Sequence, residues 1–200
     1  EQPASRPYPR IAVIGGGSWG TALASVAASA GRDVRLFSRD ADVAAAINAT
    51  RRNPVYLPDV DLPQGITATA DLAEALHGAD AVMLVVPSRA IRSVAAQMAR
   101  HIAPDVPVAL CTKGIEPVTG LLMTQVAEQE LSGNPLGAVS GPTFARETAL
   151  GHPTAATVAF PFGYADRLAP QTSPAARFAH SLSTASFQTY ISDDLIGVEI

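Results

Sequence analysis

The sequence contains little of several residue types, and each scarcity excludes a class of protein. A single cysteine, Cys111, rules out an intramolecular disulfide and fits a reducing compartment, so we expect a cytoplasmic protein. No apolar stretch approaches the roughly 18 residues that a membrane span requires. A net charge of −4 without any basic cluster argues against a nucleic-acid partner. The four histidines lack metal-ligand spacing, so we expect no metal site.

Lysine is the scarcest charged residue. The sequence has 14 cationic side chains, and Lys113 is the only one that is not arginine. A lysine ammonium is a compact point charge that the planar guanidinium of arginine does not replace at every site. Lys113 follows the apolar run 106–111 and precedes Gly114. We interpret it as a residue that meets a phosphate or a carbonyl oxygen, the alternative being an ordinary surface lysine.

Apolar strand-like runs alternate with helical patterns, which predicts an α/β fold with a doubly wound, mostly parallel sheet of the Rossmann type. Residues 1–9, with three prolines, are expected to form a flexible lead-in, residues 10–192 the dinucleotide-binding domain, and residues 160–175 a loop or variable excursion. The expected strands are 10–14, 33–37, 66–69, 80–86, 106–111, 136–140, 154–159 and 186–190. The expected helices are 18–30, 40–48, 71–77, 88–101 and 118–132.

The most informative motif is a glycine-rich turn directly after the first expected strand. Its glycines follow the spacing G-x-G-x-x-G, and a helix of small residues comes next, which is the order that a dinucleotide pyrophosphate requires. Gly15 allows the sharp turn, Gly17 removes a Cβ that would block the phosphates, and Gly20 lets helix and strand pack closely. The positive end of the helix dipole then faces the anion. The context favours nucleotide binding over a purely structural turn.

Polar loops follow four expected strands, at residues 37–40, 86–89, 111–114 and 140–143. Because the carboxyl ends of parallel strands share one edge of a sheet, we expect these loops to face a single cleft for nucleotide and substrate.

Two of these loops suggest ligands. Ser38 and Arg39 stand where an NAD-selective site usually places a carboxylate, which favours NADP(H), with NAD(H) possible. The alternative makes Asp40 a helix cap and Arg39 a solvated charge. At the fourth loop, Gly141 and Thr143 precede a helical start and could hold a phosphate ester, or could simply cap that helix.

Together these motifs resemble the bacterial NAD(P)-dependent glycerol-3-phosphate dehydrogenases. The resemblance covers nearly the whole chain in the expected order, at residues 14–23, 56–60, 85–88, 112–114, 140–145 and 194–199. It implies cofactor contacts from Ser18, Trp19, Arg39, Lys113 and Ala145, with Tyr56 as a further candidate beside Gly15, Gly17 and Gly20. It also implies substrate contacts from Lys113, Gly141 and Thr143.

The resemblance further implies interconversion of dihydroxyacetone phosphate and sn-glycerol 3-phosphate with NAD(P)H, supplying glycerophospholipid synthesis, by a homodimer. In this family a Gly-Val-Glu segment like residues 197–199 leads into a stretch whose lysine donates the proton. We therefore expect the catalytic lysine beyond Ile200 and none within the chain. Residues 193–200 would begin the helical substrate domain, which is otherwise absent, so residues 1–200 alone should be inactive.

Two alternatives stay open at this point. One is another NADPH reductase of the β-hydroxyacid or ketopantoate type, whose substrate would carry a carboxylate. The other is a non-catalytic nucleotide-sensing Rossmann module, which would have no need for Lys113 and Thr143 at the same edge.

Overall fold

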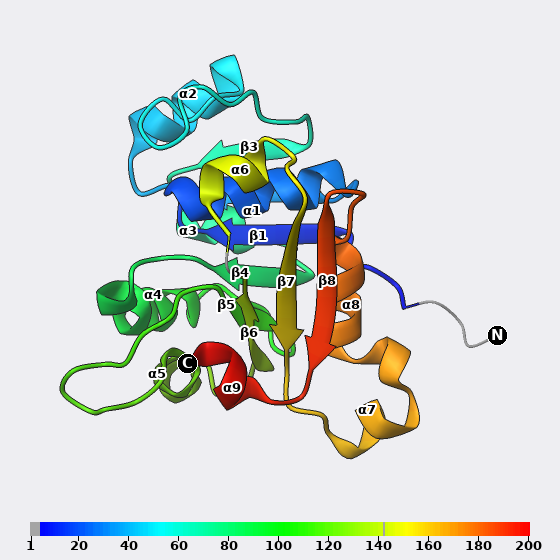
Figure 1. Cartoon of the computed structure of the whole chain (residues 1–200). Coiled ribbons are helices and arrows are strands. Elements are labelled where there is room, and N and C mark those ends of the chain that lie inside the picture. Colours follow the sequence, from blue (N-terminus) through cyan, green and yellow to red (C-terminus); the bar gives the residue numbers. More distant parts are fainter. Residues whose placement is uncertain (1–4, 142) are drawn as a thin grey trace.

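Eight strands form one sheet in the computed structural model, which describes residues 5–141 and 143–200 (Figure 1). The strand order is β3-β2-β1-β4-β5-β6-β7-β8. Strands β1 to β6 are parallel, whereas β7 runs antiparallel to β6 and pairs in parallel with β8. This confirms the expected doubly wound, mostly parallel sheet. The strands are β1 Arg10–Ile14, β2 Asp33–Phe37, β3 Ile66–Thr69, β4 Ala81–Leu84, β5 Val108–Leu110, β6 Leu136–Ser140, β7 Thr154–Ala159 and β8 Phe187–Ser192.

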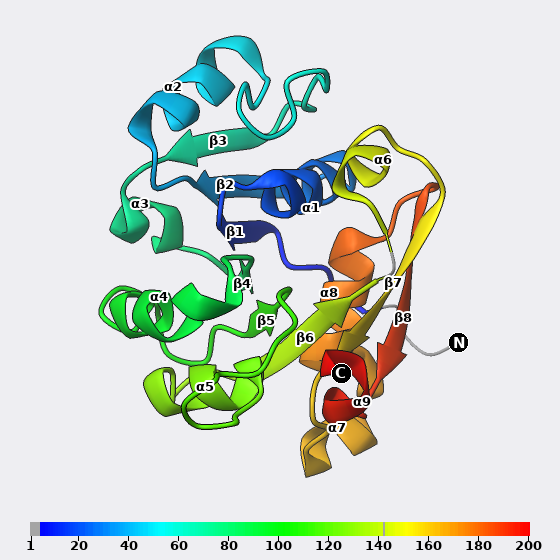
Figure 2. The same ribbon diagram turned by 60° about the vertical axis from the view of Figure 1, so that its left-hand side comes forward.

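Helices cover both faces of this sheet. Residues of α1, α2 and α8 share one hydrophobic core with the sheet, and residues of α3, α4 and α5 share the other (Figure 2). The α-helices are α1 Ser18–Ser29, α2 Ala41–Thr50, α3 Leu72–Leu76, α4 Ile91–Met98, α5 Met123–Glu130, α6 Ala145–Ala149, α7 Tyr164–Leu168, α8 Pro174–Leu182 and α9 Leu195–Glu199. Two 3₁₀ turns, η1 Ser88–Ala90 and η2 Pro170–Thr172, precede α4 and α8.

Strand β1 shows why the central strands are continuously apolar. Ile11 and Val13 belong to the first core and Ala12 and Ile14 to the second, and all four are 0% exposed. Successive side chains of a strand point to opposite faces, so a strand between two helical layers must be apolar at every position. The same alternation holds along β4 and β5.

Helix ends follow the local chemistry of the sequence. The Asp40 carboxylate accepts hydrogen bonds from the amides of Asp42 and Val43, so it caps α2. Asp71 caps α3 in the same way. Gly31 adopts a φ of 90° just after α1, a conformation that glycine reaches without a Cβ penalty.

Two segments differ from expectation. The second half of the expected flexible lead-in is packed, because Tyr8 is buried and its ring meets Phe178 edge-on with centroids 5.2 Å apart; residues 1–4 lie outside the described residues. Within and beyond the 160–175 excursion, the chain forms α7 and the buried helix α8. The prolines and glycines there delimit short helices, and Pro174 occupies the first turn of α8, where a missing N–H costs nothing.

Among the described residues, no helix combines the length and the apolar character needed to cross a bilayer.

Candidate functional site

The loops that carry the expected site residues meet at one edge of the sheet. The order of the strands reverses between the parallel neighbours β1 and β4, because β2 and β3 extend the sheet on one side and β5 and β6 on the other. At such a switch point the loops at the carboxyl ends separate and leave a crevice for ligand. Direct contacts tie the loops together, since the Thr112 hydroxyl donates to the Val86 carbonyl oxygen over 2.7 Å.

The glycine loop between β1 and α1 has the geometry that a pyrophosphate needs. Gly15 has a φ of 130°, and a Cβ there would overlap the Val85 carbonyl oxygen. A Cβ on Gly20 would overlap the Gly15 carbonyl oxygen, so this glycine sets how closely α1 approaches the loop. Apart from Gly17 itself and its two chain neighbours, no described residue comes within 4 Å of a Cβ built on Gly17, so the space in front of it is open. No side chain in the described segments caps α1, which leaves its first amides to an anion.

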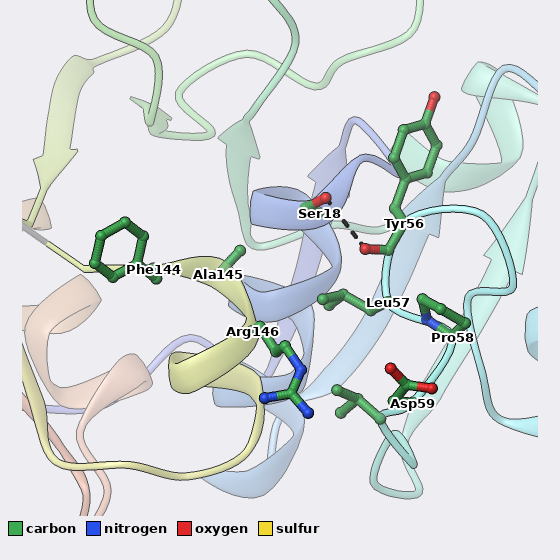
Figure 3. Close-up of a pocket in the computed structure, with 9 residues that line it drawn as sticks. Ser18, Tyr56, Leu57, Pro58, Asp59, Phe144, Ala145 and Arg146 are labelled. Atoms are coloured by element: carbon green, nitrogen blue, oxygen red, sulfur yellow. Dashed lines mark hydrogen bonds between the residues drawn. The ribbon is translucent and has the colours of Figure 1, made fainter.

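A cavity of about 300 Å³ adjoins the glycine loop (Figure 3). Three of the expected cofactor residues, Ser18, Tyr56 and Ala145, meet in its wall. The Ser18 hydroxyl donates to the Tyr56 carbonyl oxygen over 3.2 Å. The full lining is Ser18, Tyr56, Leu57, Pro58, Asp59, Val60, Phe144, Ala145 and Arg146. Trp19 is half-buried and packs against the first core.

At the end of β2, the structure separates the two charged side chains. Arg39 is exposed, and it makes no ion pair with any described residue. Asp40 is committed to α2, because its Oδ1 accepts from the Asp42 amide over 2.9 Å and from the Val43 amide over 3.3 Å. The cap and the free arginine therefore coexist at adjacent positions.

Lys113 lies on the loop that follows β5, outside the wall of the cavity. Its side chain is exposed and forms no ion pair or hydrogen bond within the described part of the chain. The same loop is anchored at Glu116, whose two carboxylate oxygens accept from Arg92 Nε and Nη2, each over 2.8 Å. Hydrogen bonds from Arg92 and from Thr119 lower the pKa of Glu116 from 4.5 to about 2.

Gly141 and Thr143 flank the connection from β6 to α6, and Pro142 between them lies outside the described residues. A Cβ on Gly141 would come within 2.7 Å of the Ala155 carbonyl oxygen, so the backbones of β6 and β7 require glycine here. The Thr143 hydroxyl is buried without a hydrogen-bond partner among the described residues. A buried hydroxyl in this state is suited to accept or donate to a ligand.

Sequence reasoning missed two residues at this edge. Arg146, in the first turn of α6, lines the cavity, and its signal was a cation just after the polar 140–143 loop. Asn53 is fully buried and hydrogen-bonds to the glycine loop. Its only signal was an Asn-Pro step inside a stretch that the prolines made look irregular.

Other candidate chemistry finds no support at this edge. Cys111 is buried at the end of β5, and burial raises the pKa of its thiol well above the usual range. A thiol in that state is a poor nucleophile. Residues 5–141 and 143–200 contain no group of three or more His, Cys, Asp or Glu side chains that could hold a metal ion.

The family model and the curated relatives that match this chain indicate the same family. Residues 10–162 match the family model described as the N-terminus of NAD-dependent glycerol-3-phosphate dehydrogenase. A relative from Rhodospirillum rubrum, named glycerol-3-phosphate dehydrogenase [NAD(P)+], is 48% identical over 191 residues, which is 95% of this chain and 52% of the relative. The chain thus spans about half the length of the curated relatives that it matches.

Solved structures show the same relationship. A crystal structure of glycerol-3-phosphate dehydrogenase from Coxiella burnetii superposes with a TM-score of 0.83 at 34% identity, covering 96% of this chain and 56% of that one. A ketopantoate reductase of the PanE/ApbA family from Ralstonia eutropha reaches a TM-score of 0.66 at 21% identity, covering 95% of this chain and 58% of that one. The second likeness shows a shared fold and nothing more.

Proposed function

Because the chain belongs to the NAD-dependent glycerol-3-phosphate dehydrogenase family, we propose that it is the dinucleotide-binding part of an oxidoreductase that interconverts dihydroxyacetone phosphate and sn-glycerol 3-phosphate. The names of its relatives support this assignment. The observation that supports it is that the glycine loop, the Lys113 loop and the residues Gly141 and Thr143 follow the carboxyl ends of β1, β5 and β6, which share one edge of the sheet. A phosphorylated substrate beside a dinucleotide requires two anion sites at such an edge.

On the cofactor side, we propose that the glycine loop and the first turn of α1 bind the pyrophosphate and that the exposed Arg39 binds a 2′-phosphate. When bound, the nicotinamide supplies or accepts the hydride. We propose NADP(H) as the preferred cofactor because the carboxylate of Asp40 is engaged in capping α2. Ser18, Tyr56 and Ala145 in the cavity wall, together with Trp19, would complete the nucleotide contacts.

On the substrate side, the exposed ammonium of Lys113 and the buried hydroxyl of Thr143 are groups without a described partner. An ammonium and a hydroxyl are the donors that bind a phosphate ester or polarise a carbonyl oxygen. We propose that Lys113 and Thr143, with the backbone at Gly141, hold the substrate phosphate and keep the central carbon near the hydride position. The proton donor is assigned to the part of the relatives that this chain does not span.

The remaining assignments follow from the family and are equally proposals. The whole enzyme would act as a homodimer in the cytoplasm and would supply glycerophospholipid synthesis. Its partners would be small molecules and a second copy of itself, with no nucleic acid.

The test is oxidation of NADPH that depends on dihydroxyacetone phosphate, measured on the full-length protein. Lys113→Ala should abolish most of kcat/KM while the protein stays folded. Lys113→Arg should restore little of kcat/KM, because the planar guanidinium of arginine does not reproduce the compact ammonium of lysine. Arg100→Ala, which removes another exposed cation after α4, is the matched control and should leave turnover unchanged. Near-normal turnover of Lys113→Ala would show that Lys113 is an ordinary surface lysine without a role in the reaction.

A further inference from the structure

Asn53 lies in the loop between α2 and β3, yet it is 0% exposed. Its Nδ2 donates to the Gly16 carbonyl oxygen over 2.9 Å and to the Thr21 hydroxyl over 2.9 Å. Its Oδ1 accepts from the amides of Val55 over 3.3 Å and Tyr56 over 3.1 Å. Both N–H groups and both lone pairs of the side chain are therefore used. Only an amide offers this combination at this length, since aspartate has no donor and leucine has neither function.

The bond to Gly16 determines how the glycine loop presents its next amide. The described residues contain no cis peptide bond, so the peptide joining Gly16 to Gly17 is trans. In a trans peptide the C=O and the N–H point in opposite directions. With the Gly16 carbonyl held by Asn53, the Gly17 N–H points away from the 51–60 loop. No described atom accepts from that N–H, and the space beside Gly17 is open.

A second contact holds the same loop in place. The Ser18 hydroxyl donates to the Tyr56 carbonyl oxygen, as the dashed line in Figure 3 shows. The 51–60 loop is thus attached to the glycine loop at Asn53 and to the first residue of α1 at Tyr56. One attachment orients a peptide of the glycine loop, and the other places a wall of the cavity.

We propose that Asn53 is a positioning residue for dinucleotide binding, which holds the Gly16 carbonyl and thereby aims the Gly17 amide at the pyrophosphate. This inference rests on the proposed cofactor site. Asn53 does not touch the cofactor, and it acts through the orientation of one peptide unit. Without its donor, the Gly16–Gly17 peptide is free to rotate, since glycine tolerates a wide range of backbone angles.

The experiment compares two variants of the full-length protein by calorimetry, with NADPH and 2′-AMP as probes. Asn53→Asp keeps the Oδ1 acceptor but loses both donors, and it should weaken NADPH by about tenfold or more. Because 2′-AMP carries no pyrophosphate, its affinity should change much less. The matched control Thr21→Val removes the other acceptor of the same Nδ2 without touching Gly16, and it should leave NADPH affinity within about threefold.

The outcomes separate this inference from the proposed function. If the unaltered protein bound neither NADPH nor NADH, the proposed cofactor site itself would be wrong. Normal NADPH binding by Asn53→Asp, or equal losses for NADPH and 2′-AMP, would overturn the role of Asn53 alone. Should Asn53→Asp not fold, the ¹⁵N–¹H signal of Gly17 in the unaltered protein decides. NADPH should shift it strongly, as expected for an amide that gains a hydrogen bond to phosphate, and an unmoved signal would refute the proposal.

Discussion

At the scale of single residues, the end of β2 shows how adjacent charges take different roles. Asp40 satisfies two amides of α2, which is the ordinary use of an aspartate at a helix start. Arg39 is left exposed directly after Ser38, which lies against Gly16 of the glycine loop. A sequence rule based only on an acidic residue near the end of β2 would predict selectivity for NAD, because Asp40 is present. The capping hydrogen bonds of Asp40 are the reason for our proposal that NADP(H) is preferred.

Replacing Arg39 with aspartate should therefore weaken NADPH far more than NADH. A charge-assisted contact to phosphate is worth roughly 1.5–3 kcal/mol, or about ten- to a hundredfold in affinity. Fluorescence titration with each cofactor measures the two constants, and Arg100→Asp makes the same charge change away from the site. Equal losses for NADPH and NADH would contradict the role given to Arg39.

The ion pair of Arg92 with Glu116 links the Lys113 loop to α4. Because the folded protein holds the pKa of Glu116 at about 2, below its ordinary 4.5, the carboxylate stabilises the fold above pH 4.5. That contribution is lost as pH falls from 4.5 towards 2. Glu116→Gln should thus be less stable than the parent at neutral pH, and the difference should shrink through this acid range.

Urea unfolding at several pH values measures this convergence. Glu128→Gln, on an exposed carboxylate of α5, is the control and should be close to the parent in stability at neutral pH. A constant gap between the parent and Glu116→Gln down to pH 2 would mean that the ion pair does not stabilise the folded state.

At the scale of elements, α8 joins the chain's first described residues to the sheet. Phe178 stacks on Phe160 with centroids 5.4 Å apart and meets Tyr8 edge-on. The Arg177 guanidinium lies 4.1 Å from the centre of the Tyr8 ring. Burial raises the pKa of the Tyr8 phenol to about 12, against the lowering effect of Arg177. This aromatic group joins the N-terminal segment to α8, together with the hydrogen bond that the Tyr8 amide donates to the Ser181 hydroxyl over 2.7 Å.

Truncating Phe178 to alanine should cost about 3–5 kcal/mol of unfolding free energy, because a buried aromatic is replaced by a cavity. NADPH affinity of the folded fraction should change little, since α8 contributes no residue to the cavity beside the glycine loop. Tyr164→Ala, at an 80% exposed aromatic of α7, is the matched control and should stay within about 0.5 kcal/mol. Comparable losses for both variants would show that α8 packs loosely.

At the scale of the whole molecule, the sheet and its helices correspond to about half the length of the curated relatives. The last helix, α9, is anchored to this half because Glu199 is buried and accepts from the amide of Thr124 over 2.9 Å and from its hydroxyl. The end of α9 therefore lies beside the start of α5 (Figure 1). Ile196 and Ile200 remain largely exposed on α9 and directly after it.

A protein consisting of residues 1–200 should bind NADPH but should not oxidise it in the presence of dihydroxyacetone phosphate. The proposed nucleotide site consists of residues within this range, whereas the proposed proton donor lies outside it. Loss of positioning and of protonation removes several kcal/mol of barrier lowering. Calorimetry should detect binding while a coupled assay on the same sample stays flat. Robust turnover would place the catalytic acid within residues 1–200.

Much of the fold was predictable because its determinants are local. Strands buried on both faces are apolar at each position, and aspartates cap α2 and α3 where the pattern places a helix start. The glycine spacing predicted the β1–α1 turn because Gly15 and Gly20 have no room for a side chain. Helix α8 was missed because its proline-rich approach hid a repeat of apolar residues at helical spacing.

The sequence by itself determined the strands of the sheet and the glycine turn, since each depends on residues close together in the chain. It also indicated the edge where the polar loops gather, because the carboxyl ends of parallel strands share one edge of a sheet. Only the tertiary structure decided that Tyr8 is packed, that β7 reverses direction and that Asn53 holds the glycine loop. Those features depend on partners far apart in the chain, such as Asn53 and Gly16, which are 37 positions apart, and Tyr8 and Ser181, which are 173 positions apart. No local pattern records such a contact, because the partners meet only after the sheet has formed.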